Sequence, residues 1–201
     1  MAKGPIYSVP FKRKREEKTN YKKRLALVKN ENPRLVARKT NKRIIAQIIE
    51  FHEKGDKTII SISNNDLKKY GYELKNKNTP TAYLTGYLIG KLALSKKIKK
   101  TIFDIGLTIS TKGNTIYAVL AGAVKAGLQI PCDEKIFPSK ERLLGEHIKG
   151  YDSSLVEKTM KAIDEKVKAW KEEEMTGILI WAIWMNGFQK QAWEEKLNQE
   201  I

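Results

Sequence analysis

Four cations lie within six residues of one another in the stretch PRLVARKTNKRIIAQII: Arg38, Lys39, Lys42 and Arg43. A cluster of this kind attracts polyanions, because its positive fields add together. Polar and apolar residues alternate before the cluster and β-branched residues follow it, which predicts two strands within residues 33–49. Thr40 and Asn41 separate the strands, and asparagine tolerates the left-handed backbone that tight hairpins need. The sequence therefore predicts a β-hairpin that gathers the four cations at one end of a sheet.

The positive charge of the chain is concentrated near its start. The 201 residues carry a formal net charge of +16. Residues 1–43 contain fifteen lysines and arginines against three glutamates, which gives +12 and leaves +4 for the remainder. A basic run is ordinarily a solvated face, and sometimes a localisation signal. Its concentration at one end of a domain with a pI near 9.7 favours nucleic-acid binding.

Residues 1–32 are predicted to be a basic N-terminal extension. Residues 2–24 show no sustained apolar period, and two prolines argue against an early helix. We expect this arm to be disordered in the free protein and to fold on RNA, because its few apolar residues cannot offset an ordering cost of about 1–2 kcal/mol per residue. Tyr7, Phe11 and Tyr21 interleave with the cations. They either stack on unpaired bases or anchor the arm to its own domain.

Residues 33–151 are predicted to form one α/β domain. A third strand over residues 58–63 extends the hairpin into a meander. A helix over residues 79–96 follows, capped by Thr79 with a proline at its first position, and a buried strand is predicted over residues 101–107. A strand on each side of a helix indicates a βαβ crossover. The predicted fold class is therefore α/β, with a mixed β-sheet and packed helices.

Small residues are expected to control how the helices pack. Gly86 and Gly90 lie on one face of the predicted helix and permit close approach of either the sheet or an RNA backbone. We expect the sheet to be the neighbour. Residues 117–125 predict a second helix of small residues that packs tightly on the sheet, and Gly127 is its natural C-terminal stop.

The rest of the chain is predicted to contain a polar segment and then a helical C-terminal segment, residues 152–201. Residues 132–151 are irregular and basic, and we interpret them as a second contact surface. Ser154 and Glu157 have capping-box spacing at the start of an amphipathic helix that extends through residue 174. Three of the four tryptophans lie in the last 25 residues. This pattern fits either a helical hairpin or a free protein-binding tail.

Enzymatic and metal-binding classes find little support. Asp104 within a predicted strand raises the alternative of a ribonuclease H-like nuclease, but two-metal chemistry needs converging carboxylates around metals about 4 Å apart. The other candidate carboxylates show no recognisable spacing, and neither GxxxxGK[ST] nor GxGxxG is present. We interpret Asp104 as capping or bonding a neighbouring backbone amide. Asp104→Asn should leave RNA binding and RNA integrity almost unchanged, because no metal depends on that carboxylate. One cysteine and two histidines assemble neither a disulfide framework nor a Cys/His zinc site, and no cofactor is predicted.

The longest apolar run holds eight residues, against the roughly 20 that a spanning helix requires. No apolar signal-peptide segment follows Met1. We therefore expect no membrane association and a cytoplasmic location.

Six segments occur in a characteristic order over residues 4–151: GPIYSVPFKRKREEKTNYKKRL, PRLVARKTNKRIIAQII, DLKKYGYELKNKNTPTAYLTGYLIGKLA, FDIGL, VLAGAVKAGLQIP and RLLGEHIKGY. Together they resemble the archaeal form of the ribosomal protein L eighteen family, the counterpart of the eukaryotic large-subunit protein L five. The resemblance implies an α/β domain, an arm threaded into rRNA and a place in the central protuberance of the large subunit. Its implied partners are 5S rRNA, large-subunit rRNA and neighbouring ribosomal proteins. Cys132 departs from the family, in which His often follows the Ile-Pro pair, and the resemblance fades after Tyr151.

Charge, aromatic interleaving and this resemblance together predict sixteen RNA-binding residues: Lys12, Arg13, Lys14, Arg15, Tyr21, Lys22, Lys23, Arg24, Arg34, Arg38, Lys39, Asn41, Lys42, Arg43, Arg142 and His147. The predicted function is a structural constituent of the large ribosomal subunit that binds 5S rRNA. An RNA-binding assembly factor outside the ribosome is the alternative of another class.

Overall fold

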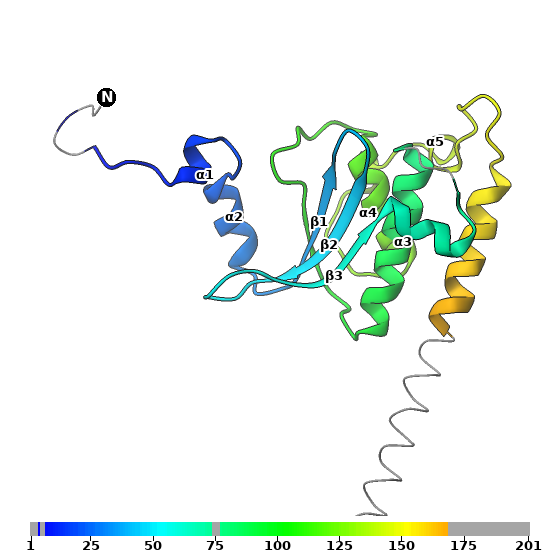
Figure 1. Ribbon diagram of the computed structural model, residues 1–201, viewed down its shortest axis with the longest axis horizontal. Coiled ribbons are helices and arrows are strands. Elements are labelled where there is room, and N and C mark those ends of the chain that lie inside the picture. The colour runs from blue at the N-terminus through cyan, green and yellow to red at the C-terminus, as the bar shows by residue number, and fades with distance from the viewer. Residues whose placement is uncertain (1–3, 5–6, 74–76, 169–201) are drawn as a thin grey trace, which may run out of the picture. The chain divides into compact units, whose positions relative to one another are not determined.

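The computed structural model describes residues 4, 7–73 and 77–168 (Figure 1). The chain divides into two compact units, residues 1–163 and 164–201. The fold and the site described below belong to the first unit. The predicted tryptophan-rich hairpin lies outside the described residues. Within the described residues, no helix combines the length and apolarity needed to cross a membrane.

A four-stranded mixed sheet forms the centre of the first unit. Its strands are β1 (Arg34–Lys39), β2 (Ile44–Glu50), β3 (Lys57–Ser63) and β4 (Ile102–Asp104), in the spatial order β3-β2-β1-β4. The first three strands form the predicted antiparallel meander, and β4 pairs with β1 in parallel. The strand order and the intervening helix confirm the predicted βαβ crossover and the mixed α/β class. β4 ends earlier than predicted, because Gly106 turns the chain with φ +62° and its N–H donates to the Asp104 carboxylate at 2.7 Å.

One face of the sheet carries the core. Leu35, Ala37, Ala46 and Ile48 alternate along β1 and β2 and are fully buried. The helix α3 (Thr79–Ser95) packs against β2 and β3, and α4 (Thr115–Lys125) packs against β1. The predicted cap of α3 is one residue out: Asn78 occupies the N-cap position and Thr79 is the first helical residue.

Helices α3 and α4 approach each other closely. Figure 1 shows α3 and α4 side by side, and a Cβ atom at Gly86 of α3 would overlap the Val119 carbonyl of α4. A Cβ atom at Gly122 of α4 would in turn overlap the Tyr83 carbonyl of α3. The expectation that the sheet is the neighbour of Gly86 is therefore wrong. The small residues of α4 serve its contact with α3, while Gly127 ends α4 as predicted, with φ +103°.

Short helices and buried hydroxyls complete the unit. The 3₁₀ helices η1 (Asn64–Tyr70) and η2 (Glu134–Ile136) and the helix α5 (Lys140–Leu144) connect the larger elements. Tyr72, which is fully buried, places its hydroxyl 2.9 Å from Thr81 Oγ1 and 3.1 Å from the hydroxyl of Tyr151. Burial, and then this hydrogen bond to Tyr72, raise the pKa of Tyr151 above its ordinary value. Residues 154–163 are helical, and the Asp152 carboxylate accepts from Ser154 N at their start.

Candidate nucleic-acid interface

The N-terminal arm contains two helices, α1 (Lys12–Arg15) and α2 (Tyr21–Val28). The prediction that the arm lacks an early helix is therefore wrong for these two segments, while its disorder in the free protein stays a prediction. Pro10 directly precedes Phe11, the N-cap of α1, where it breaks no helical hydrogen bond. The Asn20 side chain accepts from Lys23 N at 3.1 Å and caps α2, whose sequence YKKRLALV is rich in good helix formers.

The hairpin loop, residues 40–43, presents cations to solvent as predicted. Thr40 N donates to the Arg43 carbonyl at 2.8 Å, and Arg43 N donates to Thr40 Oγ1 at 2.9 Å, so the turn is closed by two short hydrogen bonds. Asn41, Lys42 and Arg43 are exposed at its tip. The loop therefore offers exposed donors to any ligand that reaches this end of the sheet.

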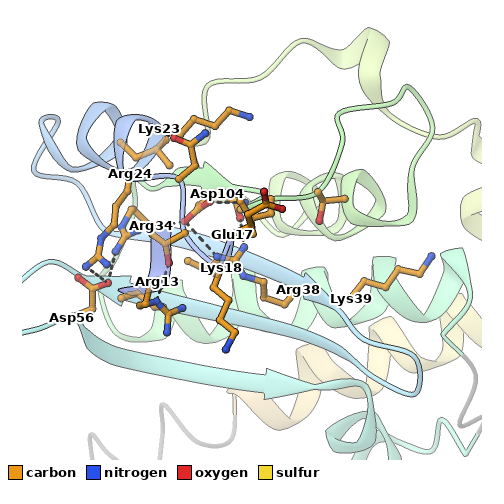
Figure 2. Close-up of a pocket in the computed structure, with 18 residues that line it drawn as sticks. Arg13, Glu17, Lys18, Lys23, Arg24, Arg34, Arg38, Lys39, Asp56 and Asp104 are labelled. Carbon is orange, nitrogen blue, oxygen red and sulfur yellow. Dashed lines mark hydrogen bonds and ion pairs between the residues drawn. The ribbon is translucent and has the colours of Figure 1, made fainter. Parts of the chain in front are cut away.

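Five charged side chains form a row in which cations and carboxylates alternate, and we call this row the charge chain. It joins Arg24, Asp56, Arg34, Asp104 and Arg38 (Figure 2). Asp56 Oδ2 lies 2.9 Å from Arg24 Nη2 and 2.8 Å from Arg34 Nη2. Asp104 Oδ2 lies 3.3 Å from Arg34 Nη1 and 3.7 Å from Arg38 Nη2. The charge chain connects helix α2 of the arm to strands β1 and β4. The connection runs through Asp56, which lies in the turn between β2 and β3.

Arg34 occupies a different environment from the other predicted RNA-binding residues. It is 4% exposed and its guanidinium is held by two carboxylates. The prediction of Arg34 as a direct RNA contact therefore needs correction: its side chain is a buried structural ion pair. Its carboxylate partners lie 22 and 70 residues away in the sequence, so no local pattern reveals them.

A hollow of about 520 Å³ lies between the arm and the sheet, and we call it the arm–sheet hollow. Seven cations and three carboxylates line it: Arg13, Lys18, Lys23, Arg24, Arg34, Arg38 and Lys39, with Glu17, Asp56 and Asp104. Figure 2 shows that these side chains come from the arm, from β1, from the turn before β3 and from the end of β4. The excess of positive charge in a concave surface focuses its field and attracts an anionic chain.

The other ten predicted residues do not line this hollow. Lys14, Tyr21 and Lys22 line a neighbouring hollow of about 320 Å³ together with Leu107, which is 55% exposed. Leu107 and Lys18 were not among the predicted residues, and nothing in their sequence spacing indicates them. The others line neither hollow: Lys12, Arg15, Asn41, Lys42, Arg43, Arg142 and His147. Arg142 belongs to α5 and His147 follows that helix, so they are not brought to the arm.

Comparison with known proteins gives a consistent result. Residues 6–101 match the family described as "Ribosomal large subunit proteins 60S L5, and 50S L18". The large ribosomal subunit protein uL18 of Methanosphaera stadtmanae is 48% identical over 155 residues, which cover 77% of this chain and 80% of the relative. The protein of the same name from Methanospirillum hungatei is 49% identical over 151 residues, covering 75% and 86%. The chain belongs to this ribosomal protein family.

Family membership makes the protein a structural ribosomal protein of archaeal type, located on cytoplasmic ribosomes, and not an enzyme. The environment of Asp104 accords with that role. Its Oδ1 atom accepts from Gly106 N, as predicted, and its Oδ2 atom faces Arg34 and Arg38. Among the residues that the structure describes, no three His, Cys, Asp or Glu side chains are grouped to hold a metal ion.

Proposed function

We propose that this ribosomal protein binds 5S rRNA and helps to attach it to the large-subunit rRNA in the central protuberance. The observation that carries the proposal is the arm–sheet hollow, where cations from the arm and from β1 converge. The exposed hairpin loop extends the same positive surface beyond the hollow. The resemblance of the six sequence segments to the family supplies the identity of the RNA.

The arrangement favours contacts to the RNA backbone. Lysine and arginine side chains that meet phosphates release condensed counterions, which drives binding without reading the base sequence. Aromatic rings add a second kind of contact. Phe11 and Tyr21 lie 5.4 Å apart between ring centroids, and Phe11 is 73% exposed, so an unpaired base can stack on it. The arm is therefore suited to single-stranded or looped segments beside a duplex.

Binding of the full-length protein to 5S rRNA, measured in the presence of excess tRNA at increasing salt concentration, tests the proposal. Each neutralised phosphate contributes about −0.7 to −0.9 to the slope of log affinity against log salt. We expect a steep slope that corresponds to several phosphates, and retention of 5S rRNA against tRNA. A flat salt response, or equal displacement by tRNA, would contradict the proposal. Stoichiometric co-purification with large subunits distinguishes a structural subunit from an assembly factor.

A further inference from the structure

We infer that Asp104 and Gly106 are positioning residues, which hold the Arg38 guanidinium in one orientation to bind a phosphate of the RNA. This inference rests on the proposed function and adds to it a fixed anchor point. Asp104 and Gly106 are not among the predicted RNA-binding residues. Their part is to restrain a side chain that touches the ligand.

Arg38 is restrained by its own strand, β1, and by the neighbouring strand β4. Its Nη1 atom donates to the Ala37 carbonyl at 3.2 Å and to the Asp104 carbonyl at 3.3 Å. Its Nη2 atom lies 3.7 Å from Asp104 Oδ2. The two hydrogens of Nη1 are thereby engaged, while Nε and Nη2 carry the remaining donors. The side chain is 42% exposed and lines the arm–sheet hollow, so these donors are available as a planar fork.

Gly106 provides the surface against which the guanidinium lies. Its φ of +62° is a backbone conformation that side chains rarely adopt. A Cβ atom there would lie 2.6 Å from Arg38 Nη1, 2.7 Å from Cζ and 3.0 Å from Nη2. The position thus requires glycine for its backbone conformation and again for the space that Arg38 occupies. Any side chain at residue 106 displaces the guanidinium from its anchors.

Asp104 is itself immobile, which makes it a useful anchor. Its side chain is 11% exposed, and it is fixed by Arg34 on one side and by the Gly106 amide on the other. Asp104 shares its charge between two arginines, so Arg38 is oriented without being neutralised. A pre-ordered arginine loses less conformational entropy on binding than a free one. The hollow's excess of cations favours a phosphate as its ligand over a guanine edge.

The geometry changes one expectation drawn from the sequence. Asp104→Asn was expected to leave RNA binding almost unchanged, since no metal depends on that carboxylate. Removing its charge weakens the restraint on Arg38, so a loss of affinity is now expected. Because Asp104→Asn also disturbs the buried Arg34, a substitution at Gly106 is the cleaner test.

The experiment uses full-length protein and 5S rRNA. Gly106→Ala and Arg38→Ala should each weaken binding about tenfold, since an arginine contact of this kind contributes that much or more. Both variants should reduce the salt slope by about 0.7–0.9, the contribution of one phosphate. In the Arg38→Ala background, Gly106→Ala should have no further effect on affinity. Gly71→Ala is the matched control, because Gly71 has a similar φ of +82° and no atom within 4 Å of an added Cβ.

Arg38→Lys provides an independent variant on an unchanged backbone. This substitution keeps the positive charge but removes the planar fork of donors, so we expect a loss of affinity close to that of Arg38→Ala. Wild-type affinity of Arg38→Lys would show that charge alone matters, and it would overturn the inference. A Gly106→Ala effect that persists in the Arg38→Ala background would also overturn it. If the variants lost discrimination at a single guanine and kept the wild-type salt slope, Arg38 would bind a base edge and not a phosphate. That result would overturn the inference. If the wild-type protein itself shows no preference for 5S rRNA, the proposed function fails first.

Discussion

The two ends of strand β1 use the same residue type for opposite purposes. At its start, Arg34 is 4% exposed between Asp56 and Asp104. At its end, the hairpin loop presents Lys42 and Arg43 to solvent. Burial of an ion pair costs desolvation, so the buried arginine must keep both carboxylates, whereas the exposed cations retain their hydration until a ligand arrives. The carboxylates around a basic residue therefore determine whether it stabilises the fold or remains available to bind a ligand.

Arg38 lies between these extremes. It occupies the same face of the strand as Arg34, because residues four apart on a strand point in the same direction. One carboxylate, Asp104, faces it at 3.7 Å, and 42% of its side chain is exposed. It is thus fixed by the fold and still accessible, which is the combination expected of an anchor residue.

The largest expected effect is on stability, at the buried end. Arg34→Ala removes the buried cation that Asp104 and Asp56 share and leaves them only the more exposed Arg38 and Arg24. Breaking a buried pair costs about 3–5 kcal/mol when no partner remains, and we expect a loss toward the lower end of that range. The midpoint of chemical denaturation should fall accordingly, with an unchanged dependence on denaturant. Arg43→Ala is the control and should unfold like wild type, since its side chain is exposed. Equal stability of the two variants would remove the distinction between the ends of the strand.

A smaller effect, on binding alone, is expected at the exposed end. Replacing Lys42 and Arg43 together by alanine should weaken 5S rRNA binding by about 1–3 kcal/mol, with the thermal unfolding temperature within a degree or two of wild type. The control replaces Lys158 and Lys161, which removes the same charge from the helix at residues 154–163. If both double variants weaken binding equally, net charge and not the hairpin loop explains the affinity.

The smallest effect is expected where the arm meets the sheet. Arg24 is 36% exposed in its pair with Asp56, so Arg24→Ala should change the free energy of unfolding by less than about 1 kcal/mol. It should nevertheless release α2, so that trypsin cleaves the arm faster in the free protein. Lys22→Ala, on the same helix, serves as control. An unchanged cleavage rate at the remaining sites would show that the charge chain does not hold the arm.

Much of the fold follows from local sequence patterns. Alternation of apolar residues places the first three strands, and the proline with its neighbours places α3 to within one residue at each end. The hairpin loop is equally local, because Thr40 and Arg43 bond each other across the turn. Helix α2 of the arm also has a local signal, the Asn20 cap, which the general absence of an apolar period outweighed in the sequence-based prediction.

What the sequence by itself determined is the inventory: an α/β domain, a hairpin with exposed cations and a charge of +12 within the first 43 residues. Only the tertiary structure decided which cations are free. Asp56 and Asp104 reach Arg34 from 22 and 70 residues away, and Gly106 meets the Arg38 guanidinium across a parallel strand pair. The same holds for Gly86, whose neighbour is α4 and not the sheet. The periodicity of the sequence indicates on which face of its helix or strand a residue lies. Which groups contact that face depends on how elements distant in the sequence pack together.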